Sequence, residues 1–379
     1  MNIKDKGNKL LDLLDKQGKS LPHIRGLEPM DHNQSYRGNI ENFIGFAQVP
    51  IGLAGPLLLQ GSVGDTEHWI PMATTEGALV ASYNRGIKAG NSGGGFLTRA
   101  TGSAVQRSPY VEFDNLVMAI EFVNWIKAQL PLMKVAVTSS SRFAKLLDLE
   151  VLHEGNGVHL TFSYETGAAA GQNMVTIVTE QILKQVLSQA PHKPCHYYIE
   201  GNMSGDKKAN LKSLSKIRGR KVVSEVVITA TATREILKST PERIVKFWQT
   251  GTLAAVYSGA VGNHGHVTNA LTAIFMACGQ DVACIAEAAV GVGRMEVTSD
   301  GDLYASLTLP GIIVGTVGGG TSLPTQKEAL ALMGCDKPEH AGTLAELCGA
   351  VALAGELSIG AAIAEGHFTA AHQAHGRKS

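Results

Sequence analysis

A strand, a glycine-rich turn and a helix follow one another directly near the middle of the sequence, and this succession constrains the fold most. Apolar and polar residues alternate over 158–164, which predicts a strand with one buried face. Glycines and alanines fill 167–171, and the apolar residues of 174–186 then recur at helical spacing. Free backbone N–H groups at such a turn suit a phosphate or a nucleotide, although the same turn also serves only to pack a helix on a sheet. Alternating strands and helices over about 105–200 favour a small α/β or split-βαβ domain inserted into a larger one.

The first part of the chain is predicted to combine helices with a loop. Residues 1–40 are polar and are expected to form a helical arm. Glycines and prolines are interleaved over 41–56, which predicts a loop. A helix is expected over 77–89, capped by Thr74 or Thr75 and ended by the glycines that follow.

The last third of the chain is rich in glycine and alanine and is predicted to be helical. Val267–Cys278 is amphipathic, and a final helix is expected from about Gly355 toward the C-terminus. The chain as a whole is therefore expected to be an α+β protein, with a large helix-rich domain, an inserted small α/β domain and an N-terminal helical arm.

Two long stretches carry no charged residue, from Thr250 to Gln280 and from Leu303 to Gln326. The first contains asparagines and histidines, and the second contains prolines and a run of three glycines, so neither is predicted to cross a membrane as a bare helix. We interpret both as buried or cleft-lining segments. The N-terminus lacks the apolar core of a secretory signal, which argues against secretion. Because no span is predicted and the net charge is zero, we expect no membrane as a partner.

Charge and cysteine content exclude further classes of protein. Lys+Arg and Asp+Glu number 33 each, so a net charge of zero offers no general attraction to nucleic acid. The five cysteines are odd in number and form no CxxC pair, which argues against a disulfide framework and a structural zinc site. A reducing compartment, the cytoplasm, and a protein without a metal are expected.

Four ionisable residues are candidates for chemistry, and each also has an ordinary structural explanation. Glu76 is expected in the first turn of its helix, where the helix dipole favours a carboxylate; in an apolar site it could instead donate a proton near neutral pH. Lys207 falls in a polar turn, whose lysines are ordinarily solvated. Asp281 precedes an apolar run in the manner of a helix N-cap. His372 falls in a C-terminal helical turn, where exposed histidines are common.

These four residues fall in or beside motifs that resemble the 3-hydroxy-3-methylglutaryl-CoA reductase family in order and approximate spacing. The motifs are Glu41–Gly45, Pro50–Leu57, Met72–Gly77, Asp206–Lys208, Gly279–Asp281, Gly315–Thr321, and Gly366-His367 followed by His372. The resemblance covers residues 40–379 and includes only the soluble catalytic portion, without the membrane anchor that some members of the family carry.

The resemblance implies the two-step reduction of 3-hydroxy-3-methylglutaryl-CoA to mevalonate and CoA by two NADPH, through a hemithioacetal and an aldehyde. Lys207 matches the cation that stabilises the developing oxyanion. His372 matches the acid that neutralises the departing CoA thiolate, and Glu76 matches the carboxyl group that protonates the aldehyde oxygen. Asp281 matches the carboxylate that couples to the lysine and the glutamate and adjusts their pKa values.

Binding residues are also implied by the resemblance. Positions near CoA are Ser82, Asn84 and Arg85, and positions near the acid end of the substrate are Arg107, Asp206, Lys208 and Asn269. Positions near the cofactor are Ser141, Arg142, Phe143, Gly167, Gly171, Asn173 and Arg377. The family uses the segment that matches 141–143 to hold the 2′-phosphate of NADPH, for which a guanidinium is the natural partner, so NADPH is expected rather than NADH.

The same resemblance implies a division into domains and an oligomeric state. Residues 41–107 and 200–379 correspond to a large domain that binds the CoA thioester, 108–199 to an inserted ferredoxin-like domain that binds NADPH, and 1–40 to an N-terminal helical arm. Active sites of this family form across a dimer, so a homodimer or a higher homo-oligomer is expected.

The chain departs from the family pattern close to the ligands. Ala168 replaces the acid of the usual Gly-Asp-Ala-Met-Gly-x-Asn motif, and no lysine is found near Thr250, where the family has one that pairs with the free carboxylate of the substrate. Losing such a partner weakens the binding of a buried carboxylate by about 2–5 kcal/mol unless another cation replaces it. Two alternatives therefore stay open: a reductase of a different acyl-CoA thioester, and a CoA-binding paralogue without catalysis, against which the four retained catalytic positions argue.

Overall fold

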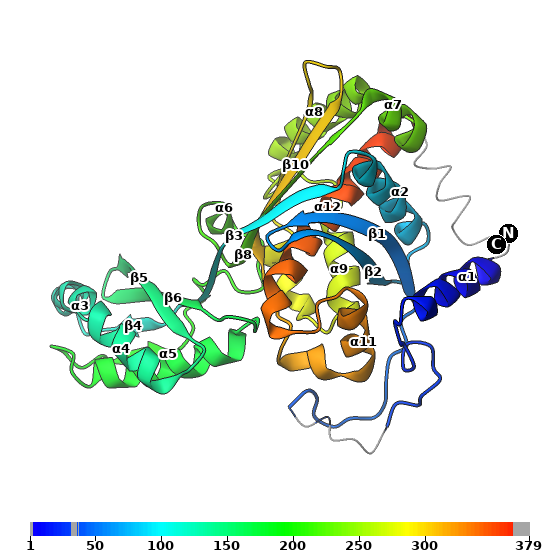
Figure 1. Ribbon diagram of the computed structural model, residues 1–379. Helices are drawn as coiled ribbons and strands as arrows, with labels where there is room; N and C mark the ends of the chain where they lie inside the picture. The colour runs from blue at the N-terminus through cyan, green and yellow to red at the C-terminus, as the bar shows by residue number, and fades with distance from the viewer. Residues whose placement is uncertain (1–2, 32–35, 37, 367–379) are drawn as a thin grey trace.

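The computed structural model in Figure 1 describes residues 3–31, 36 and 38–366. It combines α-helices with a large β-sheet, so the expected mixture of helix and strand is confirmed. His372 and Arg377, which carry predicted roles, lie outside the described residues.

The regular elements are named as in Figure 1. The strands are β1 (Ile51–Gly61), β2 (Gly64–Ala73), β3 (Phe96–Arg107), β4 (Tyr110–Glu112), β5 (Lys145–Glu154), β6 (Gly157–Glu165), β7 (His196–Tyr198), β8 (Gly219–Ile228), β9 (Val292–Val297) and β10 (Leu303–Ile312). The α-helices are α1 (Ile3–Lys16), α2 (Leu79–Ser92), α3 (Leu116–Ala128), α4 (Leu130–Ser140), α5 (Gln172–Leu187), α6 (Lys212–Ser215), α7 (Ala230–Ala232), α8 (Pro241–Ser258), α9 (Val267–Ala277), α10 (Ile285–Ala288), α11 (Pro324–Leu332) and α12 (Ala341–Ala364).

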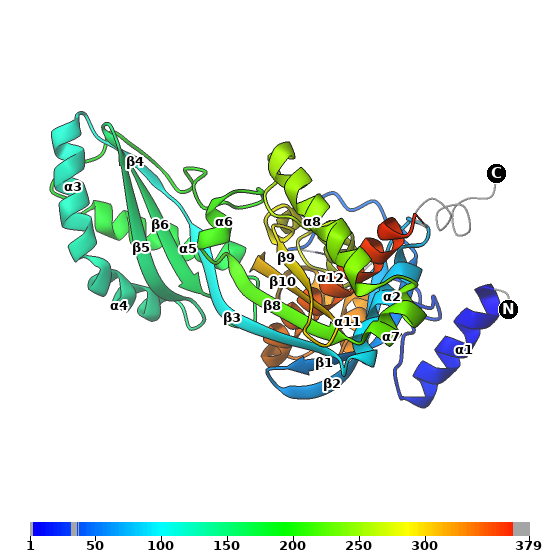
Figure 2. The same ribbon diagram turned by 90° about the horizontal axis from the view of Figure 1, so that it is seen from above.

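Strand β3 connects two parts of one mixed sheet. The strand order is β7-β4-β6-β3-β8-β10-β9, with β1 pairing with β2 and β3, and β5 pairing with β6. Residues 97–104 of β3 pair with β8, and Val105–Arg107 pair with β6. Figure 2 shows β3 running from the part of the sheet that contains β4, β5 and β6 into the part that contains β1, β8 and β10.

Two large clusters of buried apolar side chains lie at the two ends of β3. Phe96 belongs to the larger cluster and Val105 to the smaller one. The smaller cluster combines β6 with helices α3, α4 and α5. The four apolar residues of 158–164 are at most 1% exposed in it, so the predicted strand with one buried face is confirmed, as is the helix that follows the glycine turn.

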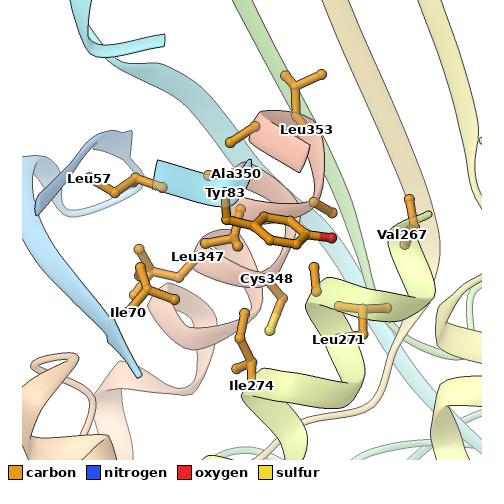
Figure 3. Packing of buried hydrophobic residues seen from close by; sticks show 14 of the residues in the cluster. Leu57, Ile70, Tyr83, Val267, Leu271, Ile274, Leu347, Cys348, Ala350 and Leu353 are labelled. Atoms are coloured by element: carbon orange, nitrogen blue, oxygen red, sulfur yellow. The ribbon is translucent and has the colours of Figure 1, made fainter. Parts of the chain in front are cut away.

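The larger cluster forms where helices α2, α9 and α12 meet the hairpin of β1 and β2. Figure 3 shows Tyr83 of α2 among Leu271 and Ile274 of α9 and Leu347 and Cys348 of α12. All five side chains are fully buried. This cluster forms the support on which the loops of the candidate site rest.

Helix α12 is the central helix of the larger cluster. The stretch Pro338–Ala364 is long and apolar enough to cross a membrane by length and composition, but 83% of its most apolar window is buried inside the protein, as in a core helix. The predicted final helix begins earlier than Gly355, because the alanines and leucines before that residue continue the same helix from Ala341.

Three local predictions differ from the structure. Among the described residues of the N-terminal arm, only α1 is helical, and turns follow it. The predicted loop over 41–56 becomes strand β1 at Ile51, because pairing with β2 overrides the local pattern of glycine and proline. The helix predicted from residue 77 begins at Leu79, because Ala78 at its N-cap adopts a left-handed conformation.

The first uncharged stretch is only partly buried. Its second half forms the buried helix α9, as predicted. Its first half continues α8, where Leu253, Val256 and Tyr257 are 64%, 74% and 92% exposed. The prediction of a buried or cleft-lining segment is therefore wrong for this part of α8 in a single chain.

Helices α2 and α12 approach each other closely at a glycine. A β-carbon on Gly86 of α2 would lie 1.8 Å from the carbonyl oxygen of Ala354 in α12. A β-carbon on Gly355 of α12 would likewise lie 2.3 Å from a ring carbon of Tyr83, one turn earlier in α2. The absence of a side chain at Gly86 therefore sets the distance between the two helices.

We expect Gly86→Ala to force the two helices apart and to lower the free energy of unfolding by about 1–3 kcal/mol. Gly342→Ala in α12 is the matched control, because nothing lies within 4 Å of the added β-carbon. It should raise the free energy of unfolding by up to about 1 kcal/mol, since alanine is the better helix former. Urea unfolding followed by circular dichroism measures both. Equal stability of the two variants would contradict the close approach.

Candidate active site

Lys207 lies in an irregular loop and pairs with Asp281. Its backbone is left-handed, with φ 57°, and its Nζ lies 3.1 Å from Oδ2 of Asp281. The two side chains are 47% and 40% exposed, so the pair is open to a ligand. The hydrogen bond that Lys207 donates to Asp281 raises the pKa of the Lys207 amine, so this amine is a cation at neutral pH.

Asp281 caps a turn, as its sequence position predicts, and also contacts Lys207. Its carboxylate accepts a hydrogen bond from the backbone N–H of Ala283 at 3.0 Å and so caps the short 3-10 turn Val282–Cys284. The same carboxylate holds Lys207. The cap fixes the direction in which Asp281 presents its second oxygen to the lysine.

Arg218 lies behind the Lys207 loop, and its side chain is only 4% exposed. Its Nε donates to Oε1 of Glu287 at 3.2 Å, and its Nη2 donates both to Asp206 and to Oε1 of Gln172. Burial raises the pKa of Glu287, and the charge of Arg218 opposes this shift. One guanidinium thus joins three separate segments of the chain.

Asp206, the residue before Lys207, lies between two arginines. Arg107 contacts its Oδ2 at 3.7 Å and also donates to Glu200 at 3.1 Å, while Arg218 donates to its Oδ1. Burial would raise the pKa of Asp206, but the charge of Arg218, a hydrogen bond from Gln172 and the charge of Arg107 together hold it below its usual value. Arg107 and Asp206 are both predicted to lie near the acid end of the substrate, and the structure brings these two residues together.

Lys208 lies beside this network and is exposed. Its Nζ donates to the backbone carbonyl of Asp206 at 2.9 Å. Its ammonium group is therefore held by a neutral oxygen and stays accessible to an anionic ligand.

Glu76 and Asn269 form a second pair. Nδ2 of Asn269 donates to Oε2 of Glu76 at 3.3 Å. Glu76 is exposed in the turn before α2, so the prediction that it occupies the first turn of that helix is wrong. Among the residues that the structure describes, Glu76 makes no side-chain hydrogen bond to Lys207 or Asp281. One chain therefore holds two separate pairs.

The residues predicted to lie near CoA all belong to α2, where Ser82 and Arg85 share one face and Asn84 lies on another. Ser82 bonds to the hydroxyl of Ser358 at 2.9 Å, and Arg85 donates to the backbone carbonyl of the same serine at 2.7 Å. Asn84 accepts a hydrogen bond from the backbone N–H of Gly55 at 2.8 Å. All three are partly exposed, so the structure brings them together on α2, while their present partners are groups of the protein.

The glycine turn before α5 has the geometry of an anion site. Gly167 and Gly171 adopt left-handed φ values of 64° and 85°, and Gly171 is the N-cap of α5 without any side-chain cap. The first backbone N–H groups of α5 are therefore free to bind an anionic ligand. Asn173 is exposed in this first turn. These residues fit the phosphate or amide groups of a nucleotide.

A segment of the larger cluster connects this turn to Asp281. The backbone N–H of Thr316 donates to the carbonyl of Ala168 at 3.0 Å. One residue earlier, Gly315 exchanges two hydrogen bonds with the side-chain amide of Gln280, at 2.9 and 3.0 Å. Gln280 precedes Asp281, so the glycine turn and the Lys207–Asp281 pair are held in one hydrogen-bonded arrangement.

The segment 141–143 lies between α4 and β5. The hydroxyl of Ser141 accepts hydrogen bonds from the backbone N–H groups of Phe143 and Ala144, at 3.3 and 3.0 Å. Arg142 and Phe143 are exposed. A guanidinium on a loop held in this way fits a phosphate ligand.

Asp206, Cys284 and Glu287 have ligand atoms within 4.8 Å of one another, close enough to hold a metal ion. Arg218 already donates to both carboxylates of this set, and burial raises the pKa of the Cys284 thiol far above its usual value. The set therefore does not fit a metal ion, since a guanidinium occupies the place of the cation. All five cysteines are free.

Sequence reasoning missed Arg218 and Glu287. The available signal was a single charge in an apolar run, because Glu287 is the one charged residue of 282–290. A charged residue in such a run requires a buried partner of opposite charge, and that partner lies 69 residues away in the sequence.

Comparison with known proteins shows which family this chain belongs to. The sequence profile described as hydroxymethylglutaryl-coenzyme A reductase matches residues 6–377. The chain belongs to this family. The 3-hydroxy-3-methylglutaryl-coenzyme A reductase of Pyrococcus abyssi is 42% identical over 369 residues, which cover 96% of this chain and 90% of that protein. The reductase of Methanocaldococcus jannaschii is 38% identical over 367 residues, which cover 96% and 90%. The resemblance seen in the motifs is thus confirmed, and with it the oxidoreductase class.

The fold of the reductase family also appears among solved structures. A class II 3-hydroxy-3-methylglutaryl-CoA reductase from Streptococcus pneumoniae, bound to NADPH in open conformations, superposes with a TM-score of 0.73. It is 22% identical, and the match covers 96% of this chain and 97% of that one. The two proteins therefore share the arrangement of helices and strands.

The lowered pKa of Asp206 predicts how stability depends on acid. Because the folded pKa is below the unfolded value of about 3.9, the stabilisation is complete above that value and is lost as the pH falls through the folded pKa. We expect Asp206→Asn to lower the free energy of unfolding at pH 7 by roughly 1–3 kcal/mol. It should also flatten the dependence of stability on pH below about pH 4.

Urea unfolding between about pH 3 and 7 measures both effects. Asp300→Asn is the control, because Asp300 is exposed in a turn. The same acid dependence in Asp206→Asn and in the unaltered protein would show that the arginines do not stabilise the Asp206 carboxylate.

Proposed function

We propose that this chain reduces 3-hydroxy-3-methylglutaryl-CoA to mevalonate and CoA with two NADPH. The observation that carries the proposal is the half-exposed Lys207–Asp281 pair inside the region that matches the family. The archaeal relatives bear the name of this reductase, and the streptococcal one was solved with NADPH bound. When bound, NADPH supplies the hydride for each reduction.

Lys207 is proposed to stabilise the negative charge that develops on the thioester oxygen. Its ammonium group is protonated at neutral pH and remains accessible while Asp281 holds it. A fixed cation lowers the barrier because the charge on the oxygen grows toward the transition state, and no reorganisation of solvent is needed. The same group serves the oxygen of the aldehyde in the second reduction.

Two proton donors complete the proposal. Glu76 is proposed to protonate the aldehyde oxygen, and His372 to protonate the CoA thiolate. Because Glu76 pairs with Asn269 rather than with Lys207 in its own chain, we propose that a second copy of the chain brings Glu76 next to the Lys207–Asp281 pair. A shared site of this kind requires a homodimer or a higher homo-oligomer.

The exposed face of α8 supports a homodimer. Leu253, Val256 and Tyr257 place three large apolar side chains together on one helix surface, and each is more than 60% exposed in the single chain. Contiguous apolar surface of this kind is typical of a protein–protein contact. Contact between copies would remove it from water.

The part of the chain that contains the smaller cluster of buried side chains is proposed to be the cofactor domain. Residues 108–199 would form a ferredoxin-like NADPH domain, inserted into a CoA-thioester domain of 41–107 and 200–379, with 1–40 as the arm. Gly167, Gly171 and Asn173 would hold the nicotinamide side. Ser141, Arg142 and Phe143 would hold the 2′-phosphate, and we propose the cytoplasm as the compartment.

The remaining binding roles follow the positions on α2 and beside Lys207. Ser82, Asn84 and Arg85 are proposed to bind CoA. The acid end of the substrate is proposed to lie near Arg107, Asp206, Lys208 and Asn269. Arg377, which lies outside the described residues, is proposed to contact the cofactor.

The purified protein should oxidise two NADPH for each CoA released from 3-hydroxy-3-methylglutaryl-CoA. Lys207→Ala should abolish this activity, because it removes the cation at the oxyanion while leaving the fold intact. Lys238→Ala is the matched control, since Lys238 is an exposed lysine whose backbone φ of 59° is nearly the same. The absorbance at 340 nm and a thiol assay measure the two products together. Full activity of Lys207→Ala would reject the proposed role.

The charges around Lys207 favour a second candidate function. Arg107 already pairs with Glu200 and Asp206, and Arg218 already pairs with Asp206 and Glu287. A substrate carboxylate would have to compete with these protein carboxylates for Arg107. The second candidate is therefore the reductase of an acyl-CoA thioester whose acyl end carries no carboxylate.

Comparing kcat/KM for 3-hydroxy-3-methylglutaryl-CoA and for the neutral 3-hydroxy-3-methylbutyryl-CoA separates the two candidates. The first candidate predicts a preference of at least about tenfold for the carboxylated thioester, which corresponds to one charge-assisted contact. A preference for the neutral thioester would establish the second candidate instead.

A further inference from the structure

A buried ion pair lies behind the Lys207 loop and is joined to it through Asp206. The side chains of Arg218 and Glu287 are 4% and 0% exposed, and they are joined by a hydrogen bond of 3.2 Å. Arg218 also holds the carboxylate of Asp206, the residue before Lys207. Burial raises the pKa of Glu287, and the nearby backbone N–H of Lys207 opposes this shift, while Oε2 of Glu287 accepts no hydrogen bond among the described residues. The loop that carries the lysine is therefore held through Asp206.

The conformation of the loop requires support of this kind. Lys207 has a positive φ, which an L-residue with a side chain adopts only at a cost in energy. The loop has little regular secondary structure of its own, and the short α6 begins only at Lys212. Contacts with neighbouring elements must therefore hold the lysine in this conformation.

We propose that Arg218 and Glu287 are positioning residues of the reduction, which keep the amine of Lys207 against Asp281. This inference rests on the proposed function, in which Lys207 acts on the thioester oxygen. Arg218 directly precedes β8 and Glu287 lies in α10, so the pair ties the loop to the sheet and to the helix that follows Asp281. Lys207 and Asp281 are thereby positioned by one and the same ion pair.

Stability alone explains this pair poorly. Removing two charges from water costs about as much as their attraction returns, so an apolar pair of the same volume would often stabilise the fold equally well. An apolar pair could not hold the Asp206 carboxylate. The charges of Arg218 and Glu287 are therefore explained better by their contacts with the Lys207 loop than by stability.

The first test uses Glu287→Gln, which keeps the shape of the side chain and removes its charge. We expect kcat to fall by about 10- to 100-fold, because small displacements of a catalytic group have effects of this size, while KM for NADPH changes little. Glu346→Gln is the matched control: Glu346 is 1% exposed on α12 and accepts hydrogen bonds from Ser62 and Ala100. This control should lose thermal stability and keep its kcat.

The second test follows the amine of Lys207 itself and needs no turnover. The charged and titratable groups that face it are Asp281, Cys284 and Asp206, and its hydrogen bond to Asp281 raises its pKa. If Glu287→Gln loosens that bond, the pKa of Lys207 should fall. Lysines methylated with ¹³C report this titration by NMR, and Lys207→Arg identifies the signal.

The outcomes separate the inference from the proposed function. A fall in the pKa of Lys207 in Glu287→Gln supports the positioning role, even if the unaltered protein fails to oxidise NADPH and the proposed function is rejected. Unchanged kcat and unchanged titration of Lys207 in Glu287→Gln would overturn the inference. Arg218→Lys provides the second variant: it keeps the charge but loses the forked contact, and should show the same fall in kcat and in pKa.

Discussion

The candidate site depends on the carboxylate of Asp206, which lies between the guanidinium groups of Arg218 and Arg107. Arg218 directly precedes β8 and Arg107 ends β3, so one carboxylate joins a loop to these two neighbouring strands. Buried charges must be paired, and few arrangements of the chain pair all of them. An irregular loop thus acquires one conformation, in which Lys207 faces Asp281.

Two glycines also fix the positions of chain segments, because they allow backbones to approach closely. At Gly86 and Gly315 a side chain would collide with backbone atoms, of Ala354 and of Ala170 respectively. At Gly86, helices α2 and α12 touch. At Gly315, the glycine turn before α5 meets the segment that bonds to Gln280. The chain contains 43 glycines, and these two show a use that is more specific than loop flexibility: close approach of one backbone to another.

The proposed site consists of two pairs within one chain. Lys207 contacts Asp281 and Asn269 donates to Glu76, and among the described residues no hydrogen bond or ion pair joins the two pairs. The archaeal relatives at about 40% identity and the streptococcal structure at 22% indicate that the arrangement of elements tolerates extensive change of sequence. The departures from the family motifs that the sequence predicts are at Ala168 and near Thr250.

Local patterns in the sequence determined much of the fold. The alternation over 158–164, the glycine turn, helix α9 and the cap formed by Asp281 could all be predicted, because each depends on neighbours within a few residues. The family could also be predicted, because its motifs are short and ordered. Only the tertiary structure decided that Ile51 begins a strand and that Glu76 precedes its helix, since pairing with β2 and the turn at Ala78 override local preference. It also decided that Arg218 meets Glu287, 69 residues away, because pairing of buried charges depends on distance in space.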